Sequence, residues 1–147
     1  MHLTVHTDYA LRVLAYLSMG GDDLVTINDI ASYYNISKNH LVKVVHGLSQ
    51  EGFIDAVRGR SGGVRLARAA TEINIGALVR LTEPGFQMVD CSQGGNDCRL
   101  MPVCRLPTVF DNAANAFLAE LDKYTLADVI KPDATLVELA SNLVRQN

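Results

Sequence analysis

The order of elements between residues 26 and 68 constrains the fold more than any other feature of the chain. Thr26 and Asp29 stand in a capping-box pattern at the start of TINDIASYY, which predicts a short helix. A turn at residues 35–37 follows, and Ser37 can cap a second helix over KNHLVKVVHGLSQE. Four apolar residues of that second helix are spaced i, i+3, i+4 and i+7 and form one buried stripe: Leu41, Val44, Val45 and Leu48.

A β-hairpin is predicted directly after these two helices. The segments FIDAV and VRLAR are strand-like, and the loop RGRSGG between them holds glycines that can take the positive φ of a hairpin tip. Two helices, a tight turn and a hairpin make a winged helix-turn-helix. We therefore expect a mainly α fold with a two-stranded wing.

Further helices are predicted on both sides of this unit. In TDYALRVLAYLSM, Thr7 can serve as N-cap with Asp8 in the first turn, and residues 74–82 form another short helix. Beyond the last cysteine, an apolar stripe of about four turns is too long for so small a domain to cover, so we expect a dimer helix. The stripe consists of Leu106, Phe110, Ala113, Phe117 and Leu121, and small residues beside it would let a second helix approach closely.

Charge and composition narrow the class of protein. The net charge is −3, but residues 36–70 carry six basic and two acidic side chains, a local charge of +4. A basic face on an acidic protein suggests a polyanionic partner, although a solvated surface has the same composition. Because no apolar run approaches the roughly 18 residues of a spanning helix, we expect a cytoplasmic protein without membrane contact. Thiols stay reduced in that compartment, which argues against a disulfide framework.

The second helix and the wing supply the candidate DNA contacts. With the apolar stripe turned inward, donor-rich side chains face outward, where Lys can reach guanine or phosphate and Asn can pair with adenine. These helix residues are Lys38, Asn39, His40, Lys43 and His46, of which the two histidines are also plausible as plain surface residues. The wing would place a thin cationic tip in a minor groove, formed by Arg58, Arg60, Ser61, Gly62, Gly63 and Arg65.

All three cysteines of the chain, Cys91, Cys98 and Cys104, lie in one segment of 14 residues. Soft sulfur donors at such spacing select zinc, copper(I) or an iron-sulfur cluster, and the spacing alone does not choose among them. Three unrelated thiols are the remaining interpretation.

Several segments together resemble one family. TDYALRVL, SKNHLVKVVHGLSQEGFI, VRGRSGGVRLAR, the three cysteines and ELDKYTLADV are similar to the iron-sulfur winged-helix repressors that include IscR and NsrR, and most similar to the nitric-oxide-sensing NsrR members. The resemblance spans about residues 1 to 130. It implies a homodimeric cytosolic repressor, not an enzyme, whose cluster state controls its binding to double-stranded operator DNA.

The resemblance also suggests a fourth ligand. IscR-like members have a histidine three residues after the third cysteine, where this chain has Pro107. NsrR-like members use an aspartate of the first helix, donated across the dimer, and Asp8 matches it. An oxygen donor on iron otherwise bound by sulfide would be the weakest bond and the most open to a small diatomic ligand. Arg12, one turn away, would hold the carboxylate. Alternatively Asp8 is only a helix-start residue, and the ligand is Asp90, Asp97, His2 or water.

These observations leave three functional hypotheses. The first is a repressor whose [4Fe-4S] cluster reacts with nitric oxide and thereby releases DNA, with a [2Fe-2S] cluster as the variant. It divides the chain into a DNA-binding domain (1–82), a cluster loop (83–104), and a dimerisation helix with C-terminal helices (105–147). The second keeps DNA binding but makes the cysteines a zinc or thiol-redox switch. The third, an electron carrier or enzyme, is disfavoured because we find no nucleotide loop and no nucleophile beside a base.

Overall fold

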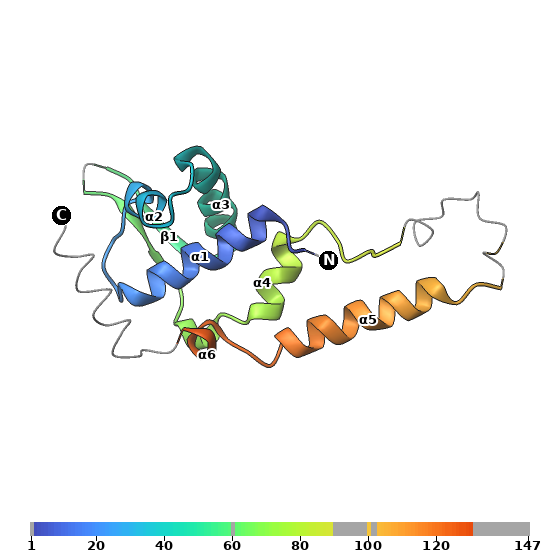
Figure 1. Ribbon diagram of the computed structural model, residues 1–147. Helices are drawn as coiled ribbons and strands as arrows, with labels where there is room; N and C mark the ends of the chain where they lie inside the picture. Colours follow the sequence, from blue (N-terminus) through green and yellow to red (C-terminus); the bar gives the residue numbers. More distant parts are fainter. Residues whose placement is uncertain (1, 60, 90–99, 101–102, 131–147) are drawn as a thin grey trace.

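The computed structural model describes residues 2–59, 61–89, 100 and 103–130. It confirms the mainly α fold with a two-stranded antiparallel wing (Figure 1). In chain order the elements are α1 (Val5–Met19), α2 (Ile27–Tyr34), α3 (Lys38–Gln50), β1 (Ile54–Val57), β2 (Gly63–Leu66), a 3-10 turn (Ala70–Glu72), α4 (Ile75–Thr82), α5 (Leu106–Leu121) and α6 (Leu126–Val129).

Helix α1 begins earlier than the sequence predicted. Its N-cap is Thr4, whose side chain accepts a hydrogen bond from the Thr7 amide at 3.3 Å. The prediction of Thr7 as N-cap is wrong because Thr7 is fully buried inside the first turn. There its hydroxyl donates to Thr82 Oγ1 at 2.9 Å. That side chain therefore serves a tertiary contact and not a helix end.

Helices α2 and α3 form the predicted helix-turn-helix. Both arms of the capping box are present: Thr26 Oγ1 accepts from the Asp29 amide at 3.2 Å, and Asp29 accepts from the Thr26 amide at 3.1 Å. Asn35 ends α2 in the left-handed conformation with φ of 52°. The chain then turns, held by a bond from the Ile36 amide to the carbonyl of Ala31 at 2.9 Å. The predicted apolar stripe of α3 is buried.

The wing is tied to the rest of the domain. Strands β1 and β2 pair antiparallel, with Ile54 opposite Leu66 and Val57 opposite Gly63. On its other side β2 exchanges two backbone bonds with the segment before α2, from Val25 to Val64 at 3.0 Å and from Val64 to Val25 at 2.8 Å. Strand β2 therefore lies between β1 on one side and the segment before α2 on the other, to which Val64 is bonded.

The core is built around α1. Its residues Ala10, Val13 and Leu14 are 0% exposed and pack against α3, α4 and the wing. The chain returns to this core after α5, because Leu126 is 1% exposed and its amide donates to the carbonyl of Ile73 at 2.8 Å. Burial of these side chains stabilises the body of the molecule.

Helix α5 projects from this body as an arm (Figure 1). Its C-terminal end is fixed to α4 by the Arg80–Asp122 ion pair and by a bond from Asn74 Nδ2 to the Asp122 carbonyl at 2.7 Å. Of the predicted stripe, Phe110, Phe117 and Leu121 are half-buried, whereas Leu106 and Ala113 are exposed. Ala114 and Leu118 are the buried residues instead. Within the described ranges, no helix has the length and apolar character to cross a membrane.

Candidate DNA-binding surface and metal-ligating residues

The outward face of α3 carries the predicted polar side chains. All five are exposed: Lys38, Asn39, His40, Lys43 and His46. Ser37 occupies the N-cap position, but its side chain makes no capping hydrogen bond. The first turn of α3 therefore presents free amide groups as well as basic side chains, a combination that attracts phosphate oxygen.

The wing tip depends on glycine at two positions. Gly59 adopts φ of 120°, which other residues rarely take. At Gly62, a Cβ atom would overlap the carbonyl oxygen of Val57, so only glycine lets the loop close there. Arg58 and Ser61 are exposed beside this closure, and Gly62 and Gly63 are half-buried. Arg60 lies outside the described residues.

Two arginines of the basic segment have partners within the protein. Arg65 Nε lies 3.8 Å from Asp55 Oδ2 across the hairpin, an exposed pair that reduces the local positive charge. Arg68 donates to the carbonyls of Gly52 and Glu51 at 3.0 and 3.2 Å, and its guanidinium lies 4.8 Å from the centroid of the Phe53 ring. Arg68 therefore caps the C-terminal end of α3, so it does not extend the cationic tip.

A groove of about 300 Å³ joins the two predicted DNA-contacting elements. The wing side of its lining includes Val57 and Gly62, and the helical side includes Lys38 and also Thr26 and Asn28 at the start of α2. Thr26 and Asn28 were not among the residues predicted from the sequence. The capping box could have indicated them, because it marks the N-terminal end of α2, which lines the same groove as the N-terminal end of α3.

Asp8 and Arg12 lie one turn apart on α1 and form an ion pair with 2.9 Å between Oδ2 and Nε. Their side chains are 47% and 44% exposed, so the carboxylate remains accessible to a further partner. The guanidinium of Arg12 also lies 5.7 Å from the centroid of the Tyr34 ring. Burial raises the pKa of Tyr34 to about 12, which keeps its phenol neutral at ordinary pH.

Of the three cysteines, the structure describes Cys104, which is a free, half-buried thiol just before α5. Cys91 and Cys98 lie outside the described residues, as do Asp90 and Asp97. Among the residues that the structure does describe, no three metal-ligating side chains come together within one chain. His2 is described and exposed, and it lines a separate pocket.

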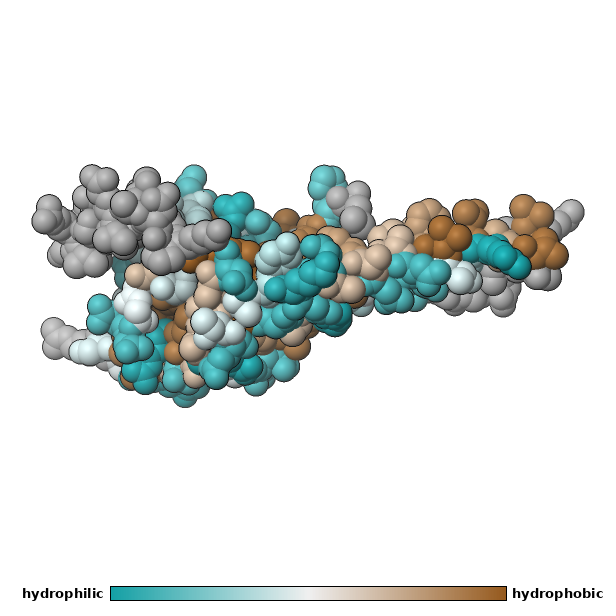
Figure 2. Space-filling model, turned by 90° about the horizontal axis from the view of Figure 1, so that it is seen from below, coloured by the Kyte–Doolittle hydropathy of each residue, from teal (hydrophilic) through white to brown (hydrophobic). Residues whose placement is uncertain are grey.

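The outer part of α5 and the residues before it expose apolar side chains. Four of them are more than half exposed: Leu100, Val103, Leu106 and Val109. Figure 2 shows this brown surface on the projecting arm. Cys104 is therefore flanked by apolar surface that nothing in the described part of the chain covers.

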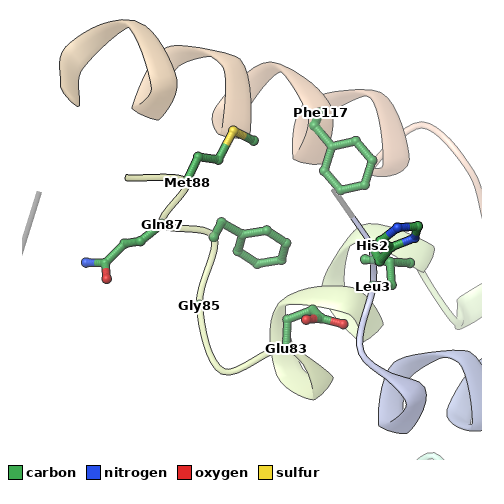
Figure 3. Close-up of a pocket in the computed structure, with 8 residues that line it drawn as sticks. His2, Leu3, Glu83, Gly85, Gln87, Met88 and Phe117 are labelled. Carbon is green, nitrogen blue, oxygen red and sulfur yellow. The ribbon is translucent and has the colours of Figure 1, made fainter. Parts of the chain in front are cut away.

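A pocket of about 560 Å³ lies between the N-terminal residues, the segment after α4 and the arm. In Figure 3, Phe117 of α5 faces the Gly85–Met88 stretch across this space, with His2 and Leu3 at the side. Its lining is mostly apolar, and the segment that forms one wall leads to Cys91.

A cluster of threonines and one carboxylate fastens the start of α1 to the end of α4. Glu83 Oε1 accepts from the Thr4 amide at 2.7 Å and from the Thr4 hydroxyl at 3.0 Å. Burial alone would raise the pKa of the Glu83 carboxyl. The hydrogen bonds that the carboxylate accepts at the start of α1 outweigh that effect and lower the pKa below its ordinary value.

Comparison with known proteins assigns the chain. The family model described as "Rrf2: Iron-dependent Transcriptional regulator" matches residues 3–132. The HTH-type transcriptional regulator NsrR of Bacillus licheniformis is 48% identical over 132 residues, covering 88% of this chain and 92% of that protein. The NsrR of Bacillus subtilis is 46% identical over 141 residues, covering 95% of this chain and 97% of that protein.

Solved structures support the fold. CymR, described as the global cysteine regulator of B. subtilis, superposes with a TM-score of 0.70 at 23% identity, covering 88% of this chain and 96% of that one. IscR of T. potens gives a TM-score of 0.68 at 24% identity, covering 88% and 86%. The matched relatives are named as HTH-type transcriptional regulators, and the family match spans most of the chain. This protein is therefore a transcriptional regulator and not an enzyme, and it belongs to the Rrf2 family of iron-dependent transcriptional regulators.

Proposed function

We propose that this regulator is a homodimeric repressor that binds operator DNA through α3 and the wing and senses nitric oxide with an iron-sulfur cluster. The ligands would be Cys91, Cys98 and Cys104 of one subunit together with Asp8 of the partner subunit, and the cluster would be [4Fe-4S]. In this arrangement residues 1–82 bind DNA, residues 83–104 hold the cluster, and residues 105–147 provide the dimerisation helix.

The observation that carries the proposal is the separation of Cys104 from α1 within one chain. The C-terminal end of α5 is fixed to α4, and this helix of 16 residues is about 24 Å long, so its first residue lies far from that attachment. Cys104 precedes the outer end of this arm, whereas the N-terminal end of α1 lies at the body (Figure 1). A carboxylate from α1 would therefore reach Cys104 most directly from a second copy packed on the exposed apolar face of the arm.

The described donors are compatible with such a site. The Cys104 thiol is free and the Asp8 carboxylate is accessible, so neither is committed to a disulfide or a buried network. Three thiolates and one oxygen suit an iron-sulfur cluster, and such a cluster would supply the reactivity toward nitric oxide. Arg12 would orient the carboxylate through its remaining oxygen.

DNA binding is supported by the exposed cations and by the groove between α3 and the wing. Arg58, Lys38 and Lys43 are exposed. Lys38 lines the groove together with Val57 and Gly62 of the wing. Contacts of these cations with phosphate would release counterions and make the affinity strongly dependent on salt.

Mixed dimers test whether Asp8 acts across the subunits. Asp8→Ala chains and Cys104→Ala chains, carrying different affinity tags, are refolded together, and the heterodimer is isolated and reconstituted anaerobically. If Asp8 acts in trans, one site of this heterodimer has all four ligands and should hold a cluster with the wild-type visible spectrum. If Asp8 acts within its own chain, neither site is complete, and a heterodimer without that spectrum would overturn the proposed arrangement.

Metal analysis tests the cofactor and its signal. Anaerobically purified protein should contain iron and acid-labile sulfide, and nitric oxide should release it from an operator duplex selected from a random DNA library. Zinc without sulfide would instead favour a zinc or thiol switch. Retention of DNA at a nitric oxide excess that bleaches the visible spectrum would contradict nitric oxide sensing.

A further inference from the structure

One side chain links the start of α4 with the end of α5. Asn74 is the N-cap of α4, where its Oδ1 accepts from the Ala77 amide at 2.9 Å. Its Nδ2 donates in the other direction, to the carbonyls of Asp122 and Tyr124 at 2.7 and 3.3 Å. Asp122 directly follows the last residue of α5. Asn74 therefore holds the beginning of one helix against the end of the other.

A charged pair bridges the same junction. Arg80 of α4 donates to both carboxylate oxygens of Asp122, with 2.7 Å between Nη2 and Oδ2, and such bidentate pairing fixes orientation as well as distance. These bonds lower the pKa of Asp122, so its carboxylate is ionised at neutral pH. Gly76 makes room for it, because a Cβ there would overlap Asp122 Oδ1. We refer to Asn74, Gly76, Arg80 and Asp122 as the elbow.

The backbone beside the elbow is paired as well. The Ile75 amide donates to the Tyr124 carbonyl at 3.0 Å, and the Leu126 amide donates to the Ile73 carbonyl at 2.8 Å. Ile73 and Leu126 are 0% and 1% exposed, so the segment after α5 is anchored in the core. Helix α5 therefore leaves the body at an attached point, and the elbow sets its direction.

Helix α4 belongs to the same packed body as the recognition helix α3. Leu78 and Val79 of α4 share one buried cluster with Leu41 and Val44 of α3, and α1 packs between them. In Figure 1, α3 and α5 lie on opposite sides of α1. Because a closely packed core resists deformation, the elbow also fixes the direction of α5 relative to α3.

We propose that the elbow determines the spacing of the two half-sites that this regulator reads on DNA. This inference rests on the proposed function, in which two copies join through α5 and each places α3 in a major groove. A rotation of about 10° at the elbow would move the far end of α5, about 24 Å away, by about 4 Å. One base pair of extra spacing moves a half-site by about 3.4 Å and turns it by roughly 35°. Small changes at the elbow are therefore large enough to alter the preferred spacing.

Operators of altered spacing test the inference. An operator duplex selected by anaerobically purified wild type is compared with duplexes that carry one base pair more or one fewer between the half-sites. The readout is the spacing ratio, the affinity for the selected duplex divided by that for an altered one. Asn74→Ser keeps an oxygen to cap α4 but removes both donated bonds. It should lower the spacing ratio about two- to tenfold, the change that the net strength of one hydrogen bond allows.

Gly76→Ala separates the elbow from the stability of the fold. Alanine favours a helix more than glycine does, while its Cβ displaces the Asp122 carboxylate from Arg80. This variant should lower the spacing ratio as Asn74→Ser does, without lowering Tm. Lys123→Gln is the matched control, because it removes a cation from the exposed pair with Glu120 at the same end of α5. It should keep the wild-type spacing ratio.

Hydrogen exchange shows in the same proteins that the elbow has loosened. Asn74→Ser should speed exchange of the Ile75 amide and leave that of the Ile36 amide, in the turn before α3, unchanged. A wild-type spacing ratio in both Asn74→Ser and Gly76→Ala would overturn the inference and leave the proposed function standing, as would an equal fall in Lys123→Gln. Wild-type protein that sediments as a monomer, also with operator bound, would overturn both.

Discussion

The Glu83 carboxylate offers a sharp test of how the start of α1 is held. It accepts two hydrogen bonds from Thr4, the N-cap of that helix, at 2.7 and 3.0 Å. Glu83→Gln keeps an acceptor oxygen but removes its charge. A hydrogen bond to a charged group contributes about 1.5 to 3 kcal/mol and a neutral one about 0.5 to 1.5 kcal/mol, so each bond should weaken by about 1 kcal/mol.

Both bonds share one oxygen that is partly open to solvent, so the two losses should together amount to no more than twice this value. We expect Glu83→Gln to destabilise metal-free protein by about 1 to 2 kcal/mol at pH 7, which lowers Tm by about 3 to 6 °C. Thermal unfolding followed by circular dichroism measures this difference. Glu72→Gln is the matched control, since its carboxylate accepts one backbone bond at an exposed site, from the Ala69 amide at 3.2 Å.

The pH dependence of this difference has a defined sign. The folded protein lowers the pKa of Glu83, so the stabilisation by its charge is present above the pKa of the unfolded chain, about 4.5, and is lost as the pH falls through the folded value. The gap between wild type and Glu83→Gln should therefore close in acid. Equal Tm values at pH 7, or a gap that persists unchanged at about pH 3.5, would refute the reasoning.

Three further predictions concern the wing. Arg58→Ala should weaken DNA binding and flatten the slope of log affinity against log salt by about 0.9. Arg65→Ala should change this slope less, because Arg65 is already paired with Asp55. Equal slope changes in the two variants would contradict this ranking. Gly62→Ala should open the wing, because the added Cβ would overlap the carbonyl oxygen of Val57. This variant should bind DNA more weakly with little change in Tm. Wild-type DNA affinity would show that the wing tip tolerates the distortion. Arg68→Ala should lower the free energy of unfolding, measured by urea titration, by about 1 kcal/mol, because Arg68 caps α3. The salt dependence of DNA affinity should stay unchanged in this variant. A flattened salt dependence would instead mean that Arg68 contacts DNA.

The sequence predicted the fold most reliably where local rules and tertiary packing agree. The capping box at Thr26 forms as expected, and the apolar stripe of α3 is buried at every predicted position. It predicted the start of α1 less well. Both Thr4 and Thr7 are plausible N-caps, and only the position of Thr82 on another helix decides that Thr7 is buried.

The candidate site could be predicted only in part, for a similar reason. Outward polar residues of α3 follow from helical periodicity, but the roles of Arg65 and Arg68 depend on neighbours across the hairpin and at the end of α3. The stripe of α5 shifted because its inner end packs against the body, which buries Ala114 and Leu118 and leaves Leu106 exposed. The roles of Cys91, Cys98 and Arg60 stay predictions, because these residues lie outside the described ranges.

The projecting arm has a consequence for the kinetic order in which the chain folds and the ligand set assembles. The body of one chain closes its core without the outer half of α5, so folding is a first-order event. In the proposed arrangement a complete ligand set joins Cys104 of one chain to Asp8 of another, which makes assembly of the site second order. At chain concentrations below the dissociation constant of the dimer, the number of complete sites should fall with the square of the chain concentration. The abundance of the regulator would then set a threshold for sensing, separately from the affinity of any ligand.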